Sequence, residues 1–252
     1  EILIDALSSV TGQGFLYRVD MRLRPWGSAG PLVTSTQGYQ TYLDKHARPW
    51  EKQAMLKARP VAGDTDIGDA FLERSADTRF RVQTRRVKET VRDMKIRTEA
   101  TLQNHGGEWG EIKLGRGSIR DVEFAAQFLQ LIHGGDDPAI RTPNTLDALD
   151  RLADRSYLSP EAHRVLTEGY IFLRTVEHHL QMMHHQQTHT LPKDPQALRR
   201  LSRRLGFEED AGERFIARYE QHRAAIRHIY LRHLGEEPSM NEHKRPRSQK
   251  TS

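Results

Sequence analysis

The stretch FLYRVDMRLRP, residues 15–25, decides the fold of the N-terminal part of the chain. Apolar and charged side chains alternate along it, which predicts a strand with residues 17, 19, 21 and 23 packed on a core. The opposite face carries Asp20 in a row with Arg18, Arg22 and Arg24. Pro25 ends the strand because proline has no amide hydrogen to donate.

A fixed carboxylate beside several arginines suits a site that handles a metal ion together with a polyphosphate. The neighbouring positive charges favour the ionised form of Asp20 at neutral pH. The alternative is an exposed strand face whose charges only pair with one another. The alternation by itself leaves both interpretations open.

The bulk properties exclude several classes of protein. The 252 residues are 36% hydrophobic and 29% charged, which is too apolar for a chain disordered throughout. The absence of cysteine excludes disulfides and thiolate metal sites. No apolar run reaches transmembrane length and no signal peptide is visible, so we expect a soluble, cytoplasmic protein. The net charge of +5 is compatible with nucleotide, nucleic acid or an acidic protein as partner.

Hydrophobic periodicity predicts a mainly α fold with a small α/β part. We expect the α/β part at 1–75, a long connecting helix and loop at 76–110, a helical bundle at 111–235 and a disordered tail at 236–252. One strand and a possible second cannot form a stable sheet alone, so further strands are expected N-terminal to Glu1. Helices are predicted at 1–10, 36–46, 50–59, 67–74, 80–103, 118–133, 143–154, 160–187, 195–205 and 210–234.

Heptad-like spacing predicts how the bundle packs. Leu166, Leu173 and Leu180 recur every seven residues in 160–187, beside a second row formed by Gly169, Val176 and Met183. One face of the last helix and one stripe of the long connecting helix are also expected to be buried: Phe215, Tyr219, Ile226 and Tyr230, and Val87, Val91, Met94 and Thr98.

A second segment, IKLGRGSIRDVEF at 112–124, combines a strand-like run, a Gly-x-Gly turn and a helix that opens at Ser118. Backbone amides at such a helix start bind anions, and Lys113, Arg116 and Arg120 would add positive charge. Ser118 with Asp121 resembles a capping box, so the alternative is a capped helix after a tight turn.

Three further patterns favour structural interpretations. Asp64 and Asp66 have the Asp-x-Asp spacing of metal sites but lie in a Pro/Gly loop typical of turns and caps. Interleaved acids predict that the arginines of 80–103 form a solvated face. Five histidines crowd one helix end without an acidic third ligand, which favours a polar helix end over a zinc site: His178, His179, His184, His185 and His189.

These segments resemble the glutamine synthetase adenylyltransferase family, whose members add and remove AMP on glutamine synthetase. The matching stretches are YRVDMRLRP at 17–25, GPLV at 30–33, WE at 50–51, KARPVAGD at 57–64 and IKLGRGSIRDVEF at 112–124. Their order and spacing match the family across most of residues 1–235. The related PII uridylyltransferase shares the helical domain type but lacks a strand like 17–25.

The resemblance implies that residues 1–75 are the C-terminal part of a nucleotidyltransferase domain. The family has two such halves, and Arg18 with Lys57-Ala58-Arg59 looks more like the N-terminal, AMP-removing half. In the family fold a Gly-Ser motif precedes an Asp-x-Asp pair, and a later strand supplies a third carboxylate. Asp20 matches this third position and nothing here matches the first two, so we expect the isolated chain to be inactive.

The resemblance also implies site roles and partners. Asp20 would be the catalytic and Mg²⁺-binding acid, acting on a tyrosine of glutamine synthetase, with PII signal protein and ATP, ADP or phosphate as further partners. No membrane or nucleic-acid partner is implied. The rival readings are a helical protein-interaction module, or a basic nucleic-acid-binding domain with its tail at 244–247. Phosphate-binding candidates are Arg22, Arg24, Lys113, Arg116 and Arg120, and other cleft candidates are Arg18, Glu51, Lys57, Arg59, Asp121 and Glu123.

Overall fold

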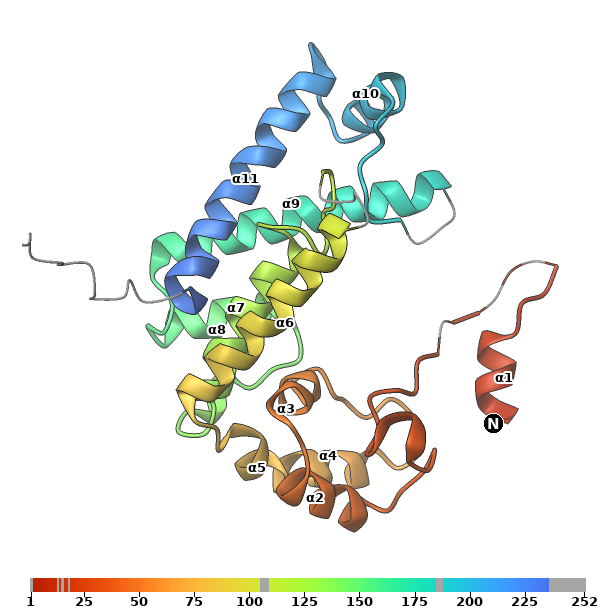
Figure 1. Cartoon of the computed structure of the whole chain (residues 1–252), viewed down its shortest axis with the longest axis vertical. Coiled ribbons are helices and arrows are strands. Elements are labelled where there is room, and N and C mark those ends of the chain that lie inside the picture. The colour runs from red at the N-terminus through yellow and green to blue at the C-terminus, as the bar shows by residue number, and fades with distance from the viewer. Residues whose placement is uncertain are drawn as a thin grey trace, which may run out of the picture. The chain divides into compact units, whose positions relative to one another are not determined.

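The structure is a computed structural model that describes residues 2–12, 14, 16–17, 19–104, 109–184 and 188–235, without the side chain of His184. The described residues are mainly helical (Figure 1), as the sequence predicts. They divide into two compact units. Unit 1 comprises Glu1–Val87 with Leu131–Pro143, and unit 2 comprises Lys88–Gln130 with Asn144–Ser252.

Short helices build unit 1. Helix α5 packs against α2, α3 and α4, and Leu43, Phe71 and Phe80 form much of the core that these helices share. None of the side chains of α1 is buried. The helices are α1 (Ile2–Ser8), α2 (Thr36–Lys45), α3 (Pro49–Met55), α4 (Thr65–Arg74), α5 (Ala76–Phe80) and the start of α6 (Thr84–Asn104), with the short 3-10 helices η1 (Gly27–Ala29) and η2 (Pro138–Ile140).

The starts of these helices follow from capping chemistry. The Ser35 side chain accepts a hydrogen bond from the Gly38 amide and starts α2, while Pro49 occupies the first turn of α3. Asp64 accepts from the amide of Asp66 at 3.1 Å and caps α4. Asp64 is therefore a helix cap, as its Pro/Gly loop predicts.

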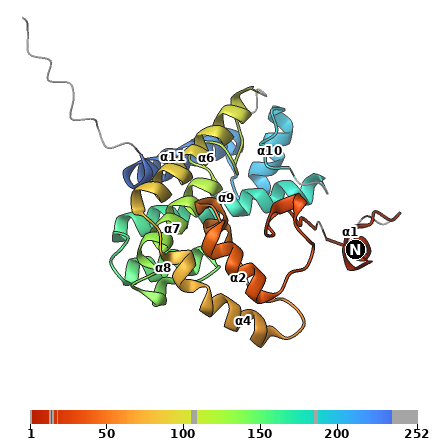
Figure 2. The same ribbon diagram turned by 60° about the horizontal axis from the view of Figure 1, so that its bottom comes forward.

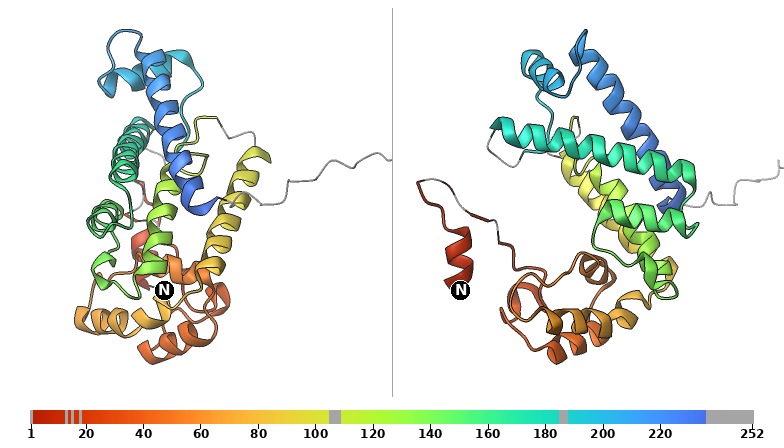
Figure 3. Two further views of the ribbon diagram at one scale, coloured as in Figure 1. Left: turned by 90° about the vertical axis from the view of Figure 1, so that its left-hand side faces the viewer. Right: turned by 180° about the vertical axis from the view of Figure 1, so that it is seen from behind.

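Longer helices build unit 2. Helix α9 (Pro160–His184) packs against α8 (Thr145–Asp154), α10 (Pro195–Arg204) and α11 (Ala211–Leu234), and α10 also packs on α11. Figures 2 and 3 show α9 crossing α11 in this bundle. Most of α6 and of α7 (Ile119–His133) belongs to the same unit.

Helices α9 and α11 approach each other closely, as the heptad spacing predicts. Leu166, Leu173 and Leu180 are fully buried. A Cβ atom on Gly169 would lie 2.7 Å from Cδ1 of Ile226, so a larger residue at this crossing would require the Ile226 side chain to shift. The predicted inner face of α11 is confirmed as well, because Phe215, Tyr219, Ile226 and Tyr230 are buried.

The expected sheet is not confirmed. Among the described residues, pairing is limited to the isolated bridges Thr11–Gly14 and Glu111–Thr190, and residues 19–24 form no strand. Tyr17 and Leu23 are exposed, contrary to the prediction that they pack on a core. An extended segment needs neighbouring strands to pair its backbone and cover its apolar face, and the described residues supply none. The strand-like run at 112–115 forms turns for the same reason.

The remaining predictions vary in outcome. The predicted helices are present to within a few residues at their ends, whereas α5 is an additional one. The predicted domain boundaries at 75 and 110 stay a prediction, and the tail at 236–252 lies outside the described residues. Within the described part of the chain, no helix combines the length and the apolar character needed to cross a membrane.

A buried histidine, His222, makes the stability of the bundle depend on pH. His222 on α11 stacks on Phe172 with ring centroids 4.7 Å apart, and its Nε2 accepts a hydrogen bond from Nε of Arg218 at 2.9 Å. Burial lowers the pKa of His222 from its ordinary value, and the Arg218 guanidinium lowers it further. The folded protein therefore favours the neutral imidazole.

We expect the protein to lose stability as the pH falls below about 6.5, the ordinary histidine pKa in an unfolded chain. The unfolded chain takes up a proton at His222 in this range while the folded chain resists it, so acid favours unfolding. Urea unfolding of the 252-residue chain between pH 7.5 and 5.5 measures this slope. His222→Gln should flatten it, whereas the exposed His228→Gln should not; equal slopes in both variants would contradict the assignment.

Candidate functional site

Asp20 and Arg22 form the charged feature that the N-terminal motif predicts. Nε of Arg22 lies 2.9 and 3.0 Å from the two Asp20 carboxylate oxygens, and Nη2 lies 2.6 Å from Oδ2. This hydrogen bond and the carboxylate charge raise the pKa of Arg22. The Asp20 side chain is 43% exposed and that of Arg22 is 79% exposed, so the pair contributes little to stability and stays open to a ligand.

Arg24 has a different environment from Arg22. Its guanidinium donates hydrogen bonds to the carbonyls of Met21 and Gly30, at 2.6 and 3.1 Å, and so closes the loop after the motif. Trp26 continues this loop and contacts the rings of Tyr42 and His46, with centroids 5.0 and 4.7 Å away. Arg24 thus holds the loop between Met21 and Gly30 together, and a phosphate-binding role for it stays a prediction.

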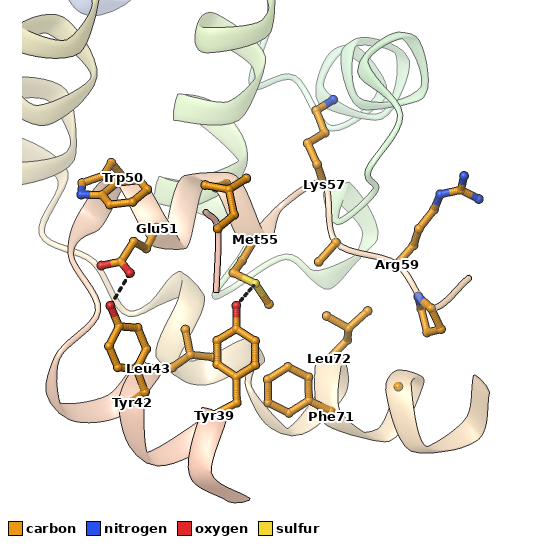
Figure 4. A pocket seen from close by; sticks show the side chains of 15 residues that line it. Tyr39, Tyr42, Leu43, Trp50, Glu51, Met55, Lys57, Arg59, Phe71 and Leu72 are labelled. Atoms are coloured by element: carbon orange, nitrogen blue, oxygen red, sulfur yellow. Dashed lines mark hydrogen bonds between the residues drawn. The ribbon is translucent and has the colours of Figure 1, made fainter. Parts of the chain in front are cut away.

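A pocket of about 430 Å³ lies in unit 1 beside this segment and is here called the aromatic pocket (Figure 4). Its floor includes the rings of Tyr39 and Phe71, which lie 5.2 Å apart, and Leu23 from the N-terminal motif also lines it. The floor suits a planar or apolar group. The pocket brings together three of the predicted cleft residues: Glu51, Lys57 and Arg59.

The three charged residues differ in what they contact. Glu51 accepts a hydrogen bond from the Tyr42 hydroxyl and, at 2.8 Å, from the Arg48 amide, so it both caps α3 and fixes the pocket wall. Lys57 donates to the carbonyl of Pro143 at 2.8 Å. Figure 4 shows the head groups of Lys57 and Arg59 extending away from the aromatic floor. The last candidate of unit 1, Arg18, lies outside the described residues.

The glycine-rich segment of unit 2 surrounds a buried carboxylate. Asp121 is completely buried; Lys95 contacts its Oδ1, and Nη1 of Arg227 lies 3.2 Å from its Oδ2. The Gly117 amide donates to Oδ2 at 2.8 Å. Glu99 joins these groups through Arg227, at 2.9 Å, and through Arg116, at 3.3 Å. We call these side chains the Asp121 cluster: Lys95, Glu99, Arg116, Asp121 and Arg227.

Lys95 is the least expected member of the Asp121 cluster. Its Nζ donates to the carbonyls of Leu114 and Gly115, at 2.9 and 2.5 Å, and its side chain is 1% exposed. Burial lowers the pKa of Lys95, although Asp121 and Glu99 counteract part of this effect. The prediction that the charges of this helix form a solvated face is therefore wrong at Lys95 and Glu99, both of which are buried.

The predicted capping box is not formed. The Ser118 hydroxyl donates to the carbonyl of Lys113 at 2.8 Å, and the Asp121 carboxylate reaches the amide of Gly117 instead of that of Ser118. The turn requires glycine at 117, because its φ is +64° and an added Cβ would lie 2.1 Å from the carbonyl oxygen of Arg223. Asp121 thus organises a turn and is not open to a ligand.

The other predicted residues of unit 2 also have structural contacts. Lys113 lies 3.5 Å from the buried Glu177, and Arg116 pairs with Glu99. The Arg120 guanidinium lies over the ring of Phe124, 5.5 Å from its centroid. The hydroxyl of Tyr170 contacts Glu123 at 3.5 Å. Nucleotide binding by Lys113, Arg116 and Arg120 stays a prediction.

The described histidines of this helix end do not gather as metal ligands. Nδ1 of His189 lies 2.9 Å from Glu177, and burial, followed by the Lys113 charge, lowers the pKa of His189. His185 and the side chain of His184 lie outside the described residues. Across the described ranges, no three His, Asp or Glu side chains gather as metal ligands.

This result also bears on magnesium. Asp20 is one carboxylate and its two oxygens already face Arg22, so the described residues alone do not fit a magnesium site. The described part of the N-terminal motif presents one exposed acid, Asp20, paired with Arg22.

Sequence reasoning missed the buried ionic residues. Lys95 and Glu99 continue the spacing of the buried Val87 and Val91 at intervals of four, which places them on the core face of α6. Glu177 lies between Leu173 and Leu180 in the same way on α9. A charged residue at a core position of a helical repeat indicates a buried ion pair, because a buried charge needs a partner.

Comparison with known proteins finds two family models that match successive parts of the chain. Residues 1–74 match the family model described as glutamate-ammonia ligase adenylyltransferase. Residues 78–233 match the family model described as GlnD PII-uridylyltransferase.

Curated relatives identify the family more specifically. A bifunctional glutamine synthetase adenylyltransferase/adenylyl-removing enzyme from Cutibacterium acnes is 45% identical over 204 residues, covering 79% of this chain and 20% of the relative. The enzyme of the same name from Streptomyces avermitilis is 38% identical over 224 residues, covering 88% of this chain and 22% of the relative. The chain belongs to the glutamine synthetase adenylyltransferase/adenylyl-removing enzyme family. It spans about one fifth of the length of these relatives.

We predict that Gly117→Ala destabilises the chain by more than about 1 kcal/mol, because alanine disfavours the positive φ and its Cβ would clash with the Arg223 carbonyl. Gly212→Ala is the matched control, because a Cβ there meets nothing within 4 Å. Urea unfolding measures both. If the two variants are equally stable, the tight turn over the Asp121 cluster is not required.

Proposed function

We propose that this chain is part of an enzyme that transfers adenylyl groups to or from glutamine synthetase. The observation that carries the proposal is the 45% identity to an enzyme of that name over 79% of the chain. The exposed Asp20–Arg22 pair is the local chemistry that supports it.

In the whole protein we assign Asp20 as one of several acidic groups at the reaction centre. Two hydrogen bonds from the Arg22 guanidinium fix the orientation of the exposed Asp20 carboxylate. A group that binds a metal ion or orients a substrate needs such a fixed orientation. The exposed apolar side chains of Tyr17 and Leu23 support the further proposal that residues 17–24 join a sheet there. Magnesium remains a prediction for the whole protein.

The modified group, the partners and the half of the enzyme are proposed in addition to the reaction itself. We propose a tyrosine of glutamine synthetase as the modified group, ATP, ADP or phosphate as small partners, and PII signal protein as a regulator. The sequence at Lys57-Ala58-Arg59 favours the AMP-removing half. A cytoplasmic location is expected for such a partner set.

A helical interaction module is the second candidate function. Its support is a groove of about 1090 Å³ between α10 and the start of α11, lined by arginines such as Arg199 and by acids such as Glu213. A groove of mixed charge suits contact with another protein. The basic tail that suggests nucleic-acid binding lies outside the described residues.

Asp20→Asn in the protein at its full natural length tests the proposed enzyme. We expect phosphate-dependent AMP release from adenylylated glutamine synthetase, or ATP-dependent AMP attachment, to fall on the order of a hundredfold, the usual cost of losing one key polar group. Asp77→Asn is the matched control, because Asp77 is an exposed acid paired with Arg81 at 3.1 Å in the same unit. Unchanged rates of both reactions in a folded Asp20→Asn protein would exclude the assignment.

The 252-residue chain alone should release no AMP from adenylylated glutamine synthetase, with or without magnesium, because its described residues do not gather a set of metal ligands. Mass spectrometry of glutamine synthetase after incubation measures this. Metal-dependent release would contradict the expectation. Binding to glutamine synthetase without turnover would favour the interaction module.

A further inference from the structure

A second hollow in unit 1 has a different character from the aromatic pocket. It measures about 220 Å³ and lies where the end of α3, the end of α4, α5 and residues 141–143 meet. We call it the Arg79 pocket. It shares Ala58 and Leu72 with the aromatic pocket, so one wall separates the two hollows. Its lining residues include Leu56, Ala76, Arg79, Phe80, Arg141 and Thr142.

Arg79 is the notable lining residue because it is a buried cation. Only 8% of it is exposed, and one Nη donates to the carbonyl of Leu72. Its Nε is buried and has no hydrogen-bond partner. No carboxylate among the described residues forms an ion pair with it, and Glu73, which also lines the pocket, is exposed.

A second guanidinium lies against the same aromatic ring. The Cζ atoms of Arg79 and Arg141 are 5.4 and 4.7 Å from the centroid of Phe80. Nε of Arg141 donates to the carbonyl of Gly134 at 2.7 Å, which fixes its direction. Burial and then the charge of Arg141 lower the pKa of Arg79 to about 10, so Arg79 keeps its charge at neutral pH.

The buried positive charge of Arg79 is unfavourable by itself, and the nearby charge of Arg141 adds to the cost. A buried cation costs free energy unless an anion or several acceptors compensate it, and the carbonyls nearby are neutral. An oxyanion bound in the pocket would offset the positive charges of Arg79 and Arg141, which both line it. A phosphoryl or carboxylate group occupies little more space than a few water molecules of about 30 Å³ each, which the pocket accommodates.

We propose that the Arg79 pocket is a binding site for a small oxyanion, a phosphoryl or carboxylate group held by Arg79 and Arg141. The apolar side chains of Leu56 and Ala76 favour a ligand with a compact apolar body behind its charged end. This site does not depend on the adenylyl-transfer activity, because neither arginine belongs to the predicted catalytic segment.

Calorimetric titration of the 252-residue chain tests the site. Inorganic phosphate is the probe in one arm and glutarate in the other, each against sodium chloride of equal ionic strength. We expect saturable binding in at least one arm, and the stronger arm identifies the anion. Arg79→Gln should weaken that binding about tenfold or more, as expected when a charged hydrogen-bond donor is lost.

Two further variants keep the test decisive. Arg81→Gln removes an exposed arginine two residues away, which pairs with Asp77, and should leave binding unchanged. If Arg79→Gln does not fold, as judged by circular dichroism, Thr142→Leu reduces the pocket from the other side and should weaken binding instead. No saturable binding in either arm, or equal binding by the Arg79, Thr142 and Arg81 variants, would overturn the proposal.

Discussion

The structure of unit 2 depends on one buried carboxylate. Asp121 is fully buried and receives the Lys95 ammonium, the Arg227 guanidinium and the Gly117 amide. These partners come from α6, from α11 and from the turn before α7, so a single side chain joins three parts of the bundle. Removing one partner would leave a buried charge uncompensated, which is far more costly than losing an exposed pair.

This constraint separates two motifs that look alike in the sequence. Both place acids among arginines, yet Asp121 is buried with its charge compensated, whereas Asp20 is exposed and paired with Arg22. The glycine-rich segment therefore forms a structural turn around Asp121. In the N-terminal motif, by contrast, the carboxylate of Asp20 is accessible to a ligand. The two segments fall in the ranges of two different family models, residues 1–74 and residues 78–233.

Much of the helical fold could be predicted from the sequence, because the periodicity of residues such as Leu166 and Leu173 reports directly on burial. The strand at 15–24 could not be confirmed, because a strand is defined by partners that the described residues do not supply. The spacing of Lys95 from Val87 and Val91 signalled its burial, but its pairing with Asp121 could not be foreseen, because pairing across α6 and α7 is a property of the packed helices. The sequence named Glu51, Lys57, Arg59 and Asp121 as cleft candidates; the structure places the first three around the aromatic pocket, whereas Asp121 is buried.

A double-mutant cycle between Lys95 and Asp121 tests the central constraint most directly. Lys95→Met, Asp121→Leu and the double variant are compared by urea unfolding of the 252-residue chain. Each single change should cost about 3–5 kcal/mol, since each leaves a buried charge without its partner. The double change should cost clearly less than the sum of the two. Additivity within about 0.5 kcal/mol would show that the two side chains do not interact and would contradict the account.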